Sequence, residues 1–373
     1  MKKALFLQSD VADPYVVYAK QRQHHSIVWN ETDSLWAVYS HAACTSLLQD
    51  ASAWIPPQHA DRNRLLKDAG RMLVAHLARL ANPPAHLAFR QAVMALFAQL
   101  QPAAIDTMLS QLLGDATETD WVATVCRTLP ALAVMKGLGL AQTDIERILP
   151  HTECLTKIML PAKTEEQVND INPVAEEVFS IVSRHIVATP ALRALAPDEA
   201  TLNIYTANFI GLLIQSVDAG RGLLSNSLVQ ALTRRADDTR PGRQYWQQLV
   251  VETLRFDPPI HNTRRVVTQD TQLDGQWLRQ GDQVLLVLAA ANRDPAIFAH
   301  PNQFDPARAG NDRHLTFGAG NHACAARHWS VALAAETLAT LFEKKTVRLL
   351  PQEILYAPLV NARLPQQLRI ELA

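Results

Sequence analysis

Residues 202–232 constrain the fold more than any other part of the sequence. Their apolar side chains recur at helical spacing, and in residues 204–214 they cover almost the whole circumference of the expected helix. A helix that is apolar on nearly every side must be surrounded by other elements, because none of its faces is well solvated by water. The segment therefore predicts a helix buried in the middle of a large core.

The rest of the chain is also mainly helical in character. Alanine and leucine are frequent, glycine is scarce, and helical spacing of apolar residues predicts helices at residues 120–139 and 325–344. Alternation of apolar and polar residues is rare and predicts only a few short strands. These are a hairpin of residues 26–29 and 35–39 joined by residues 30–34, and single strands at residues 283–288 and 367–372.

The order of these elements predicts the fold class. The sequence has no internal repeat, no strand–helix alternation of the kind a parallel sheet needs, and no Gly/Ser-rich linker. We therefore expect one continuous unit over residues 1–373, mainly α with minor β. The β parts are expected near residues 26–39, 261–290 and 345–373.

Charge and composition exclude several function classes. Lys and Arg total 35 against 36 Asp and Glu, which argues against a nucleic-acid binder, and 48% hydrophobic residues exclude wholesale disorder. The longest apolar run, residues 284–291, has eight residues, whereas a membrane span needs about 20. The N-terminal residues lack the apolar core of a signal peptide. We expect a soluble, cytoplasmic monomer that binds neither nucleic acid nor membrane.

The strongest local signal is the segment F-G-A-G-N-H-A-C at residues 317–324, which lies just before the predicted helix 325–344. Gly318 and Gly320 allow a tight turn and a close approach to something flat and bulky. The helix N-terminus favours the thiolate of Cys324, and a thiolate so placed is a suitable axial ligand for haem iron. The other cysteines, at positions 44, 126 and 154, are far apart, form no C-x-x-C pair and fit a reducing compartment.

Three other interpretations of this loop remain open from the residues alone. A single cysteine is often only a small buried apolar residue, although that explains neither glycine. Residues 318–323 formally match the dinucleotide fingerprint G-x-G-x-x-A, with Glu343 downstream, but no convincing strand precedes them. A zinc site is the third interpretation, and no standard ligand spacing supports it. Its ligands would be His314, His322, Cys324 and His328.

The loop resembles the haem-binding loop F-G-x-G-x-H-x-C of the cytochrome P-450 family, in its soluble bacterial form. Three further motifs resemble that family in the same order along the chain. They are P-P-x-H-x-x-x-R at residues 83–90, E-x-x-R at residues 252–255, and a meander-like region at residues 292–308. The resemblance covers roughly residue 10 to the end.

The resemblance implies a cytochrome P-450 fold, a single haem-containing unit, with haem b (iron protoporphyrin IX) as cofactor. Cys324 is then the ligand of the iron, within a loop whose Phe317, Gly318, Gly320 and His322 surround the haem. The family positions that bind the haem propionates are occupied by His86, Arg90, Arg265 and His322. Glu252 and Arg255 form a structural ion pair on one helix face. The sequence departs from the family at Ala326, where glycine is usual.

The central helix differs from the family where it crosses the haem. The family has an acid followed by threonine there, whereas Asp218 is followed by Ala219, and Gln215 replaces a small residue. Gln215 and Ala219 are four residues apart and share one side of the helix. The resemblance implies that Asp218, Gln215 and Ala219 occupy the catalytic positions of this helix. Four explanations remain open: Gln215 bonds only to the helix backbone, Gln215 supplies the missing donor, the substrate supplies it, or dioxygen activation is weak.

The resemblance implies a haem-thiolate monooxygenase that oxidises, and most simply hydroxylates, a small organic molecule of specialised metabolism with dioxygen. Electrons derived from NAD(P)H would come from an external ferredoxin or flavodoxin. Arg327 and His328 are candidates for its docking surface. The substrate is free or tethered to a carrier protein. The alternative is an atypical non-oxygenase or peroxide-using haem-thiolate protein, because Ala219 replaces the threonine.

Overall fold

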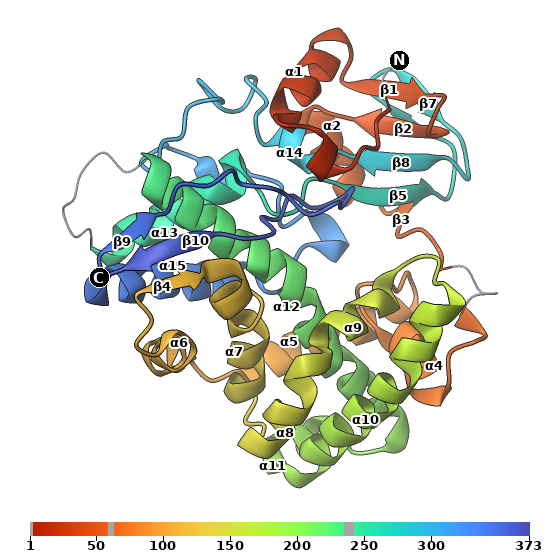
Figure 1. Cartoon of the computed structure of the whole chain (residues 1–373). Helices are drawn as coiled ribbons and strands as arrows, with labels where there is room; N and C mark the ends of the chain where they lie inside the picture. Colours follow the sequence, from red (N-terminus) through yellow and green to blue (C-terminus); the bar gives the residue numbers. More distant parts are fainter. Residues whose placement is uncertain (1–2, 59–62, 235–241) are drawn as a thin grey trace. The chain divides into compact units, whose positions relative to one another are not determined.

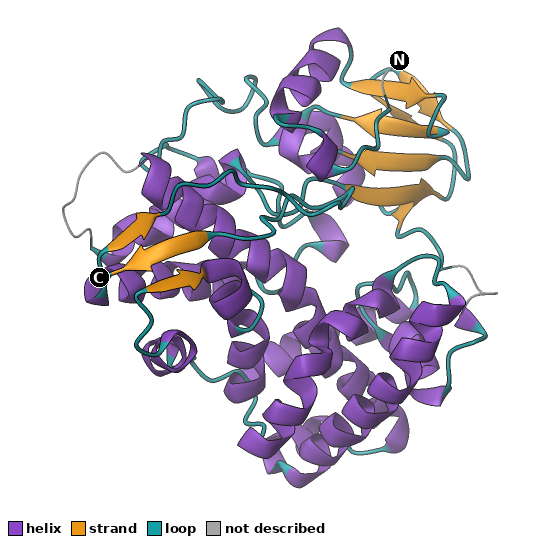
Figure 2. Ribbon diagram, viewed as in Figure 1, coloured by secondary structure: helices purple, strands orange, loops and turns teal. Residues whose placement is uncertain are grey.

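The computed structural model describes residues 3–58, 63–234 and 242–373, which form two compact units (Figure 1). We call Met1–Pro56, Ile105–Arg127 and Asp218–Ala373 the mixed unit, and Pro57–Ala104 and Thr128–Val217 the helical unit. All the described strands belong to the mixed unit (Figure 2). The prediction of a mainly helical fold with minor β structure is confirmed.

The larger sheet of the mixed unit has the strand order β1-β2-β8-β5-β3. The predicted hairpin is confirmed, because β1 and β2 pair antiparallel from Ile27 opposite Val38 to Asn30 opposite Leu35. The predicted strand at 283–288 is β8, which ends at Leu286 because helix α14 begins at Leu288. The strands are β1 (Ile27–Asn30), β2 (Leu35–Val38), β3 (Ala53–Trp54), β5 (Thr263–Val267) and β8 (Gln283–Leu286).

Both faces of this sheet are buried. Val284 and Leu286 belong to an apolar cluster with Leu47 of helix α2 (His41–Gln49). The intervening Leu285 belongs to a second cluster with Tyr18 of helix α1 (Pro14–His24). Successive side chains of a strand point to opposite faces. Burial on both faces therefore explains why residues 284–291 form a continuous apolar run instead of an alternating one.

The mixed unit also contains a three-stranded sheet of order β4-β10-β9 and a β6–β7 hairpin. The predicted C-terminal strand is confirmed as β10. The sequence did not predict β3 and β4, because runs this short carry no readable alternation. The strands are β4 (Glu118–Asp120), β6 (Thr271–Leu273), β7 (Gln276–Leu278), β9 (Val347–Leu349) and β10 (Arg369–Leu372).

The helices of the mixed unit pack around α15, the helix predicted at residues 325–344. It contacts α13 and α6, and the rings of Trp246 and Phe342 stack with centroids 4.7 Å apart. The helices are α1 (Pro14–His24), α2 (His41–Gln49), α6 (Ile105–Leu113), α13 (Arg243–Phe256), α14 (Leu288–Ala291) and α15 (Arg327–Lys344). Short helical turns are η1 (Gln8–Asp10), η2 (Val122–Cys126), η5 (Asn311–Arg313) and η6 (Gly320–His322).

The helical unit is built around α10, which begins with a capping box between Thr164 and Gln167 and packs against α4. None of the described helices of the chain is long and apolar enough to cross a membrane. The helices are α4 (Asp68–His76), α5 (Ala85–Gln99), α7 (Leu129–Gly137), α8 (Gln142–Ile148), α9 (Thr152–Thr156), α10 (Glu165–Ala188) and α11 (Pro190–Leu195). Two short turns are η3 (Leu149–His151) and η4 (Lys157–Met159).

The helix predicted at residues 120–139 is wrong as a single element. β4 ends at Asp120, a π turn follows at Val122–Cys126, and α7 starts only at Leu129. Pro130 explains the interruption, because it has no N–H to donate to the carbonyl of Cys126 and its ring would clash there. Its fixed φ instead suits the first turn of α7.

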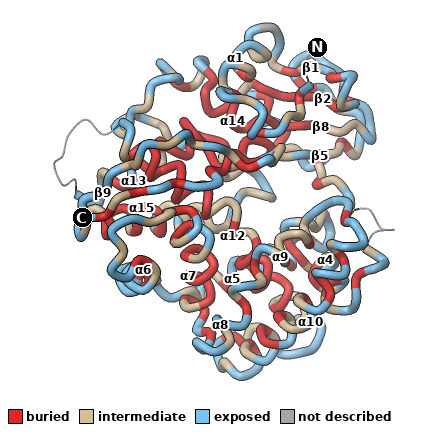
Figure 3. The backbone as a smooth tube through the Cα atoms, viewed as in Figure 1, coloured by how far each residue is buried: buried red, intermediate tan, exposed pale blue. Residues whose placement is uncertain are grey.

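The predicted central helix is confirmed as α12 (Glu199–Arg234), which contributes residues to both units. Phe209, Ile210 and Leu213 are fully buried, and so is Leu228, which lies 29 residues beyond Glu199 at the start of the helix. Buried residues are drawn in red in Figure 3. A helix of 36 residues that is buried along most of its length accounts for the apolar stretch in the sequence.

Gly222 of α12 lies at a point of close packing within the mixed unit. A Cβ atom built on it would lie 2.5 Å from Pro259 Cβ and would also clash with Leu364 Cδ2. Real carbon atoms do not approach so closely, so only glycine allows the segments around Pro259 and Leu364 to touch the helix backbone.

We predict that Gly222→Ala lowers the free energy of unfolding by about 1–3 kcal/mol, because the added methyl group overpacks this contact. Urea unfolding followed by circular dichroism measures the change. Gly242→Ala is the matched control, because a Cβ at Gly242 meets no atom within 4 Å, and it should change stability by no more than about 0.5 kcal/mol. Equal losses in the two variants would contradict the prediction.

Candidate functional site

The cysteine loop, residues 315–324, is a tight turn closed by its own backbone. The N–H of Gly318 donates to Leu315 O at 2.7 Å, and the N–H of Cys324 donates to Phe317 O at 2.8 Å. Cys324 is exposed and lies three residues before α15 begins at Arg327. The thiol is therefore held by a fixed backbone and is accessible to a ligand.

The two glycine positions of the loop differ in how closely they pack against their neighbours. Both adopt left-handed backbone conformations, with φ of +67° at Gly318 and +65° at Gly320. A Cβ on Gly320 would clash with Leu48 O and lie 3.1 Å from Gln49 Cα, at the end of α2. A Cβ on Gly318 would meet nothing closer than His322 O at 3.9 Å. Gly320 thus packs the loop onto α2, whereas Gly318 is required only for its left-handed backbone conformation.

The structure argues against the two rival metal and nucleotide interpretations of this loop. No group of three or more His, Cys, Asp or Glu in the described part of the chain could hold a metal ion. His314 is instead buried, and its Nδ1 accepts a hydrogen bond from the N–H of Thr316. Burial, aided by the charge of Arg327, lowers the pKa of His314 to about 3. The loop follows the turn η5 rather than a strand, so the dinucleotide interpretation is also wrong.

Ala326, the departure from the family motif, causes no backbone conflict. It caps the N-terminus of α15 with φ −85° and ψ 5°. An alanine adopts this conformation without the strain that a left-handed residue would have.

Glu252 and Arg255 of α13 form a fully buried ion pair. Arg255 donates to Glu252 from Nε at 2.9 Å and from Nη2 at 2.6 Å, and neither side chain is exposed. The remaining donors of Arg255 bind the carbonyl oxygens of Asn292, Pro301 and Gln303 at 2.9–3.2 Å. The pair is therefore a node that fixes the backbone of the meander region.

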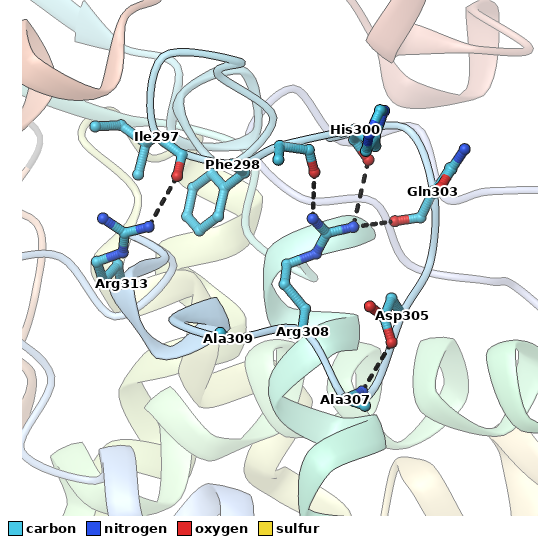
Figure 4. A pocket seen from close by; sticks show the side chains of 10 residues that line it. Ile297, Phe298, His300, Gln303, Asp305, Ala307, Arg308, Ala309 and Arg313 are labelled. Carbon is cyan, nitrogen blue, oxygen red and sulfur yellow. Dashed lines mark hydrogen bonds between the residues drawn. The ribbon is translucent and has the colours of Figure 1, made fainter.

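Arg308, within the meander-like region, is a third member of this node. Its Nε lies 3.3 Å from Glu252 Oε1. Its other nitrogens donate to the carbonyls of residues 299, 300 and 303 around a surface pocket (Figure 4). Figure 4 shows the Arg308 guanidinium at the centre of these carbonyls, and the network gives it a structural function.

Asn292 connects the node to the cysteine loop, and sequence reasoning missed this role. Its Oδ1 accepts from the N–H of Leu315 at 2.6 Å, and its Nδ2 donates to Thr316 Oγ1 at 2.8 Å. Thr316 Oγ1 in turn donates to Leu254 O of α13 at 2.6 Å. The base of the loop is thereby fixed to the helix that carries the buried ion pair.

Two predicted propionate ligands lie in the mixed unit with the cysteine loop. Arg265 is buried on β5, where its Nη1 donates to Arg264 O at 2.7 Å and to Thr263 Oγ1 at 3.2 Å. His322 lies in η6, two residues before Cys324, and is half-buried. Phe317 is also half-buried, and its ring lies 5.5 Å from that of His314.

The other two predicted propionate ligands, His86 and Arg90, lie in the first turns of α5 in the helical unit. They are four residues apart and therefore share one side of the helix. Burial, together with the nearby Arg90 charge, lowers the pKa of His86. The shift disfavours the protonated form of the His86 imidazole, whose N–H group is the donor available to an anion.

The predicted distal residues lie in a stretch of α12 that is continuous helix. The Gln215 amide nitrogen donates to Gly211 O at 2.8 Å, one turn earlier in the same helix. This contact corresponds to the simplest of the four explanations, in which Gln215 bonds to its own backbone. Asp218 and Ala219 follow in the mixed unit, and both are half-buried.

Comparisons with known proteins agree with these features. The cytochrome P-450 family model matches residues 228–341. The erythromycin C-12 hydroxylase of Saccharopolyspora erythraea is 28% identical over 328 residues, which cover 80% of this chain and 78% of that protein. The biotin biosynthesis cytochrome P-450 of Bacillus subtilis is 25% identical over 381 residues, which cover 96% of each.

Solved structures share the fold over nearly the whole chain. The crystal structure of CalO2 superposes with a TM-score of 0.86 at 21% identity and covers 100% of this chain and 99% of that chain. P450BioI, solved in complex with an acyl carrier protein ligated to hexadec-9Z-enoic acid, gives a TM-score of 0.83 at 22% identity. That match covers 97% of this chain and 99% of the other.

We predict that Gly320→Ala lowers the free energy of unfolding by about 3 kcal/mol or more, because it adds both a left-handed strain and a clash with α2. Gly318→Ala adds only the left-handed strain and should cost about 1–2 kcal/mol. Urea unfolding of the purified proteins compares the two. A loss for Gly320→Ala no greater than that for Gly318→Ala would show that the contact with α2 is unimportant.

Proposed function

Because the chain belongs to the cytochrome P-450 family, we propose that it is a haem-thiolate monooxygenase with Cys324 as the ligand of the haem iron. The observation that carries the proposal is the cysteine loop itself. An exposed thiol follows a turn closed by its own backbone hydrogen bonds, in which Gly318 and Gly320 have left-handed conformations. These are the requirements for binding a flat, bulky group through sulfur.

The chain's residues suit such a cofactor in chemistry as well as in shape. When bound, haem supplies the oxygen chemistry that no amino-acid side chain provides. We propose that His86, Arg90, Arg265 and His322 bind its propionates, because their N–H groups are suitable donors to carboxylates. Phe317 and the two glycines would contact the macrocycle, whereas Glu252 and Arg255 hold the loop through Asn292 and touch neither cofactor nor substrate.

We expect Cys324→Ser to abolish the red-shifted Soret band of the reduced carbon monoxide adduct, because a serine oxygen does not replace the thiolate donor. Absorption spectra of the reduced protein with carbon monoxide are the measurement. Cys154→Ser is the matched control, because Cys154 is half-buried on α9 and distant in sequence from the loop, and it should keep the band. Colourless wild-type protein, or an unchanged band in Cys324→Ser, would refute the function.

The proposed reaction is oxidation, most simply hydroxylation, of a small organic molecule of specialised metabolism with dioxygen. NAD(P)H-derived electrons would be delivered by an external ferredoxin or flavodoxin. His328 is exposed next to the cysteine loop and is a candidate contact for this acidic partner, whereas Arg327 already donates to Asp312 O at 2.6 Å. Spectral titration with candidate small molecules, each tested both free and linked to a carrier protein, distinguishes a free substrate from a tethered one.

The distal residues support one explanation over the others. One N–H of Gln215 is used by Gly211 O, so Gln215 is a poor candidate for the missing proton donor. We propose that the Asp218 carboxyl moves protons without the usual alcohol beside it, and that a hydroxyl or amide of the substrate takes the place left by Ala219. The second candidate function is that of a non-oxygenase or peroxide-using haem-thiolate protein. It is supported by the same replacement of the usual threonine by Ala219.

We predict that Ala219→Thr lowers the hydrogen peroxide released per NADPH consumed, because it restores a hydroxyl beside Asp218. Gln215→Ala should leave this ratio unchanged, since Gln215 bonds to its own helix. The measurement is peroxide and NADPH accounting with surrogate redox proteins and a bound ligand. A ratio that falls in neither variant refutes a proton-delivery role at position 219, and a higher ratio in Gln215→Ala would show that Gln215 does supply protons.

A further inference from the structure

A chain of buried polar groups, unused by the proposed chemistry, joins the N-terminal segment of the mixed unit to the turn after α13. Tyr15 OH lies 2.7 Å from Asp257 Oδ1 and 3.4 Å from His261 Nε2. Tyr18 OH lies 3.0 Å from His261 Nδ1, and Gln8 Nε2 donates to Tyr18 OH at 3.2 Å. We call these five residues the tyrosine–histidine chain.

The hydrogen bonds of the tyrosine–histidine chain are all donated in the same direction, from Gln8 towards Asp257. The Tyr15 hydroxyl donates to the Asp257 carboxylate, so its oxygen accepts from His261 Nε2–H. His261 Nδ1 is then the acceptor for the Tyr18 hydroxyl, whose oxygen accepts from Gln8. Complete burial, with the charges of Arg363 and Arg293, lowers the pKa of His261 well below its usual value, which keeps the ring neutral as this arrangement requires.

Arg363 forms a second connection between the same segments. Its guanidinium donates to the carbonyls of Gln8, Val11 and Ala12 at 3.0–3.4 Å. Its backbone N–H donates to Pro259 O at 2.9 Å. The N-terminal segment therefore holds two turns at once, the one around residues 257–262 and the one around residues 359–365.

These two turns lie against α12 beside the predicted distal residues. Pro259 and Leu364 touch the helix at Gly222, which is three residues beyond Ala219 and therefore on the same side one turn further along. Arg221 donates to Pro365 O at 2.9 Å. Asn226 donates to Asp257 O at 3.0 Å. The backbone positions of both turns are thus fixed by directional hydrogen bonds from the two helical turns that follow Ala219.

Apolar packing alone could hold these segments together without any buried polar group. Burying phenols, an imidazole, a carboxylate and a guanidinium is unfavourable unless every group is paired, and a paired network holds its members in one geometry. His261 is fully buried, and Tyr18 is 3% exposed. The network therefore fixes the position of the two turns more narrowly than apolar contacts would.

We propose that Tyr18 and Arg363 are specificity-determining positioning residues: through His261 and Pro259 they set the shape of the substrate-binding wall beside Ala219. The proposal rests on the proposed function, because it requires a substrate to occupy the space near Ala219. Neither residue touches the substrate, so both act through the backbone of the turns. The N-terminal segment, far from the cysteine loop in sequence, thereby controls which ligands fit.

The test uses the haem-loaded protein and two probes that bind the iron directly, imidazole and the larger 4-phenylimidazole. The variants are Tyr18→Phe, which removes one hydroxyl, and Arg363→Lys, which keeps the charge. Tyr39→Phe is the matched control, because Tyr39 is also buried in the cluster that contains Tyr18. Spectral titrations give the affinity ratio of the two probes, and thermal unfolding reports stability separately.

We expect imidazole affinity to stay at the wild-type value in all three variants. The 4-phenylimidazole-to-imidazole ratio should change by at least about fivefold in Tyr18→Phe and Arg363→Lys, the equivalent of about one net hydrogen bond, and not in Tyr39→Phe. A wild-type ratio in both network variants, or an equal change in Tyr39→Phe, overturns the proposal. Wild-type protein without the thiolate Soret band instead refutes the proposed function, so the two failures are distinguishable.

Discussion

The burial of the Glu252 carboxylate is the constraint on which much of the mixed unit depends. A carboxylate removed from water is stable only when its oxygens accept enough hydrogen bonds, and Glu252 receives them from Arg255, Arg308 and the N–H of Asp305. Arg255 needs acceptors for its remaining N–H groups and finds them in three meander carbonyls. One ion pair thus directs the chain between β8 and the cysteine loop.

Asn292 carries this constraint from the ion pair to the loop that bears Cys324. It accepts from Leu315 and donates to Thr316, so the loop is attached to α13 by side chains and to α2 by the glycine contact at Gly320. The tyrosine–histidine chain follows the same principle beside α12. In both places buried polar side chains are linked by hydrogen bonds, and these bonds fix backbone that carries no regular secondary structure.

The sequence predicted the helical fold, the first hairpin and α12, because helical and strand periodicities are local properties of a segment. The single helix predicted at residues 120–139 was wrong. The apolar spacing there is helical, but Pro130 marks the start of a new helix. The sequence could not predict β3 and β4, because Ala53 pairs with Val267 and Glu118 pairs with Glu371. Strands of two or three residues are specified by such distant partners and not by their own pattern.

By itself the sequence determined the elements whose cause lies within a few residues: the E-x-x-R pair on one face of α13, the glycines before Cys324 and the acid without its alcohol at Asp218 and Ala219. Tertiary structure alone decided that Gly320 meets α2, that Arg308 and Asn292 complete the node, and that Tyr18 reaches His261. The physical reason is that hydrogen bonds and close packing join groups up to hundreds of residues apart, and a spacing rule contains no information about which of them meet.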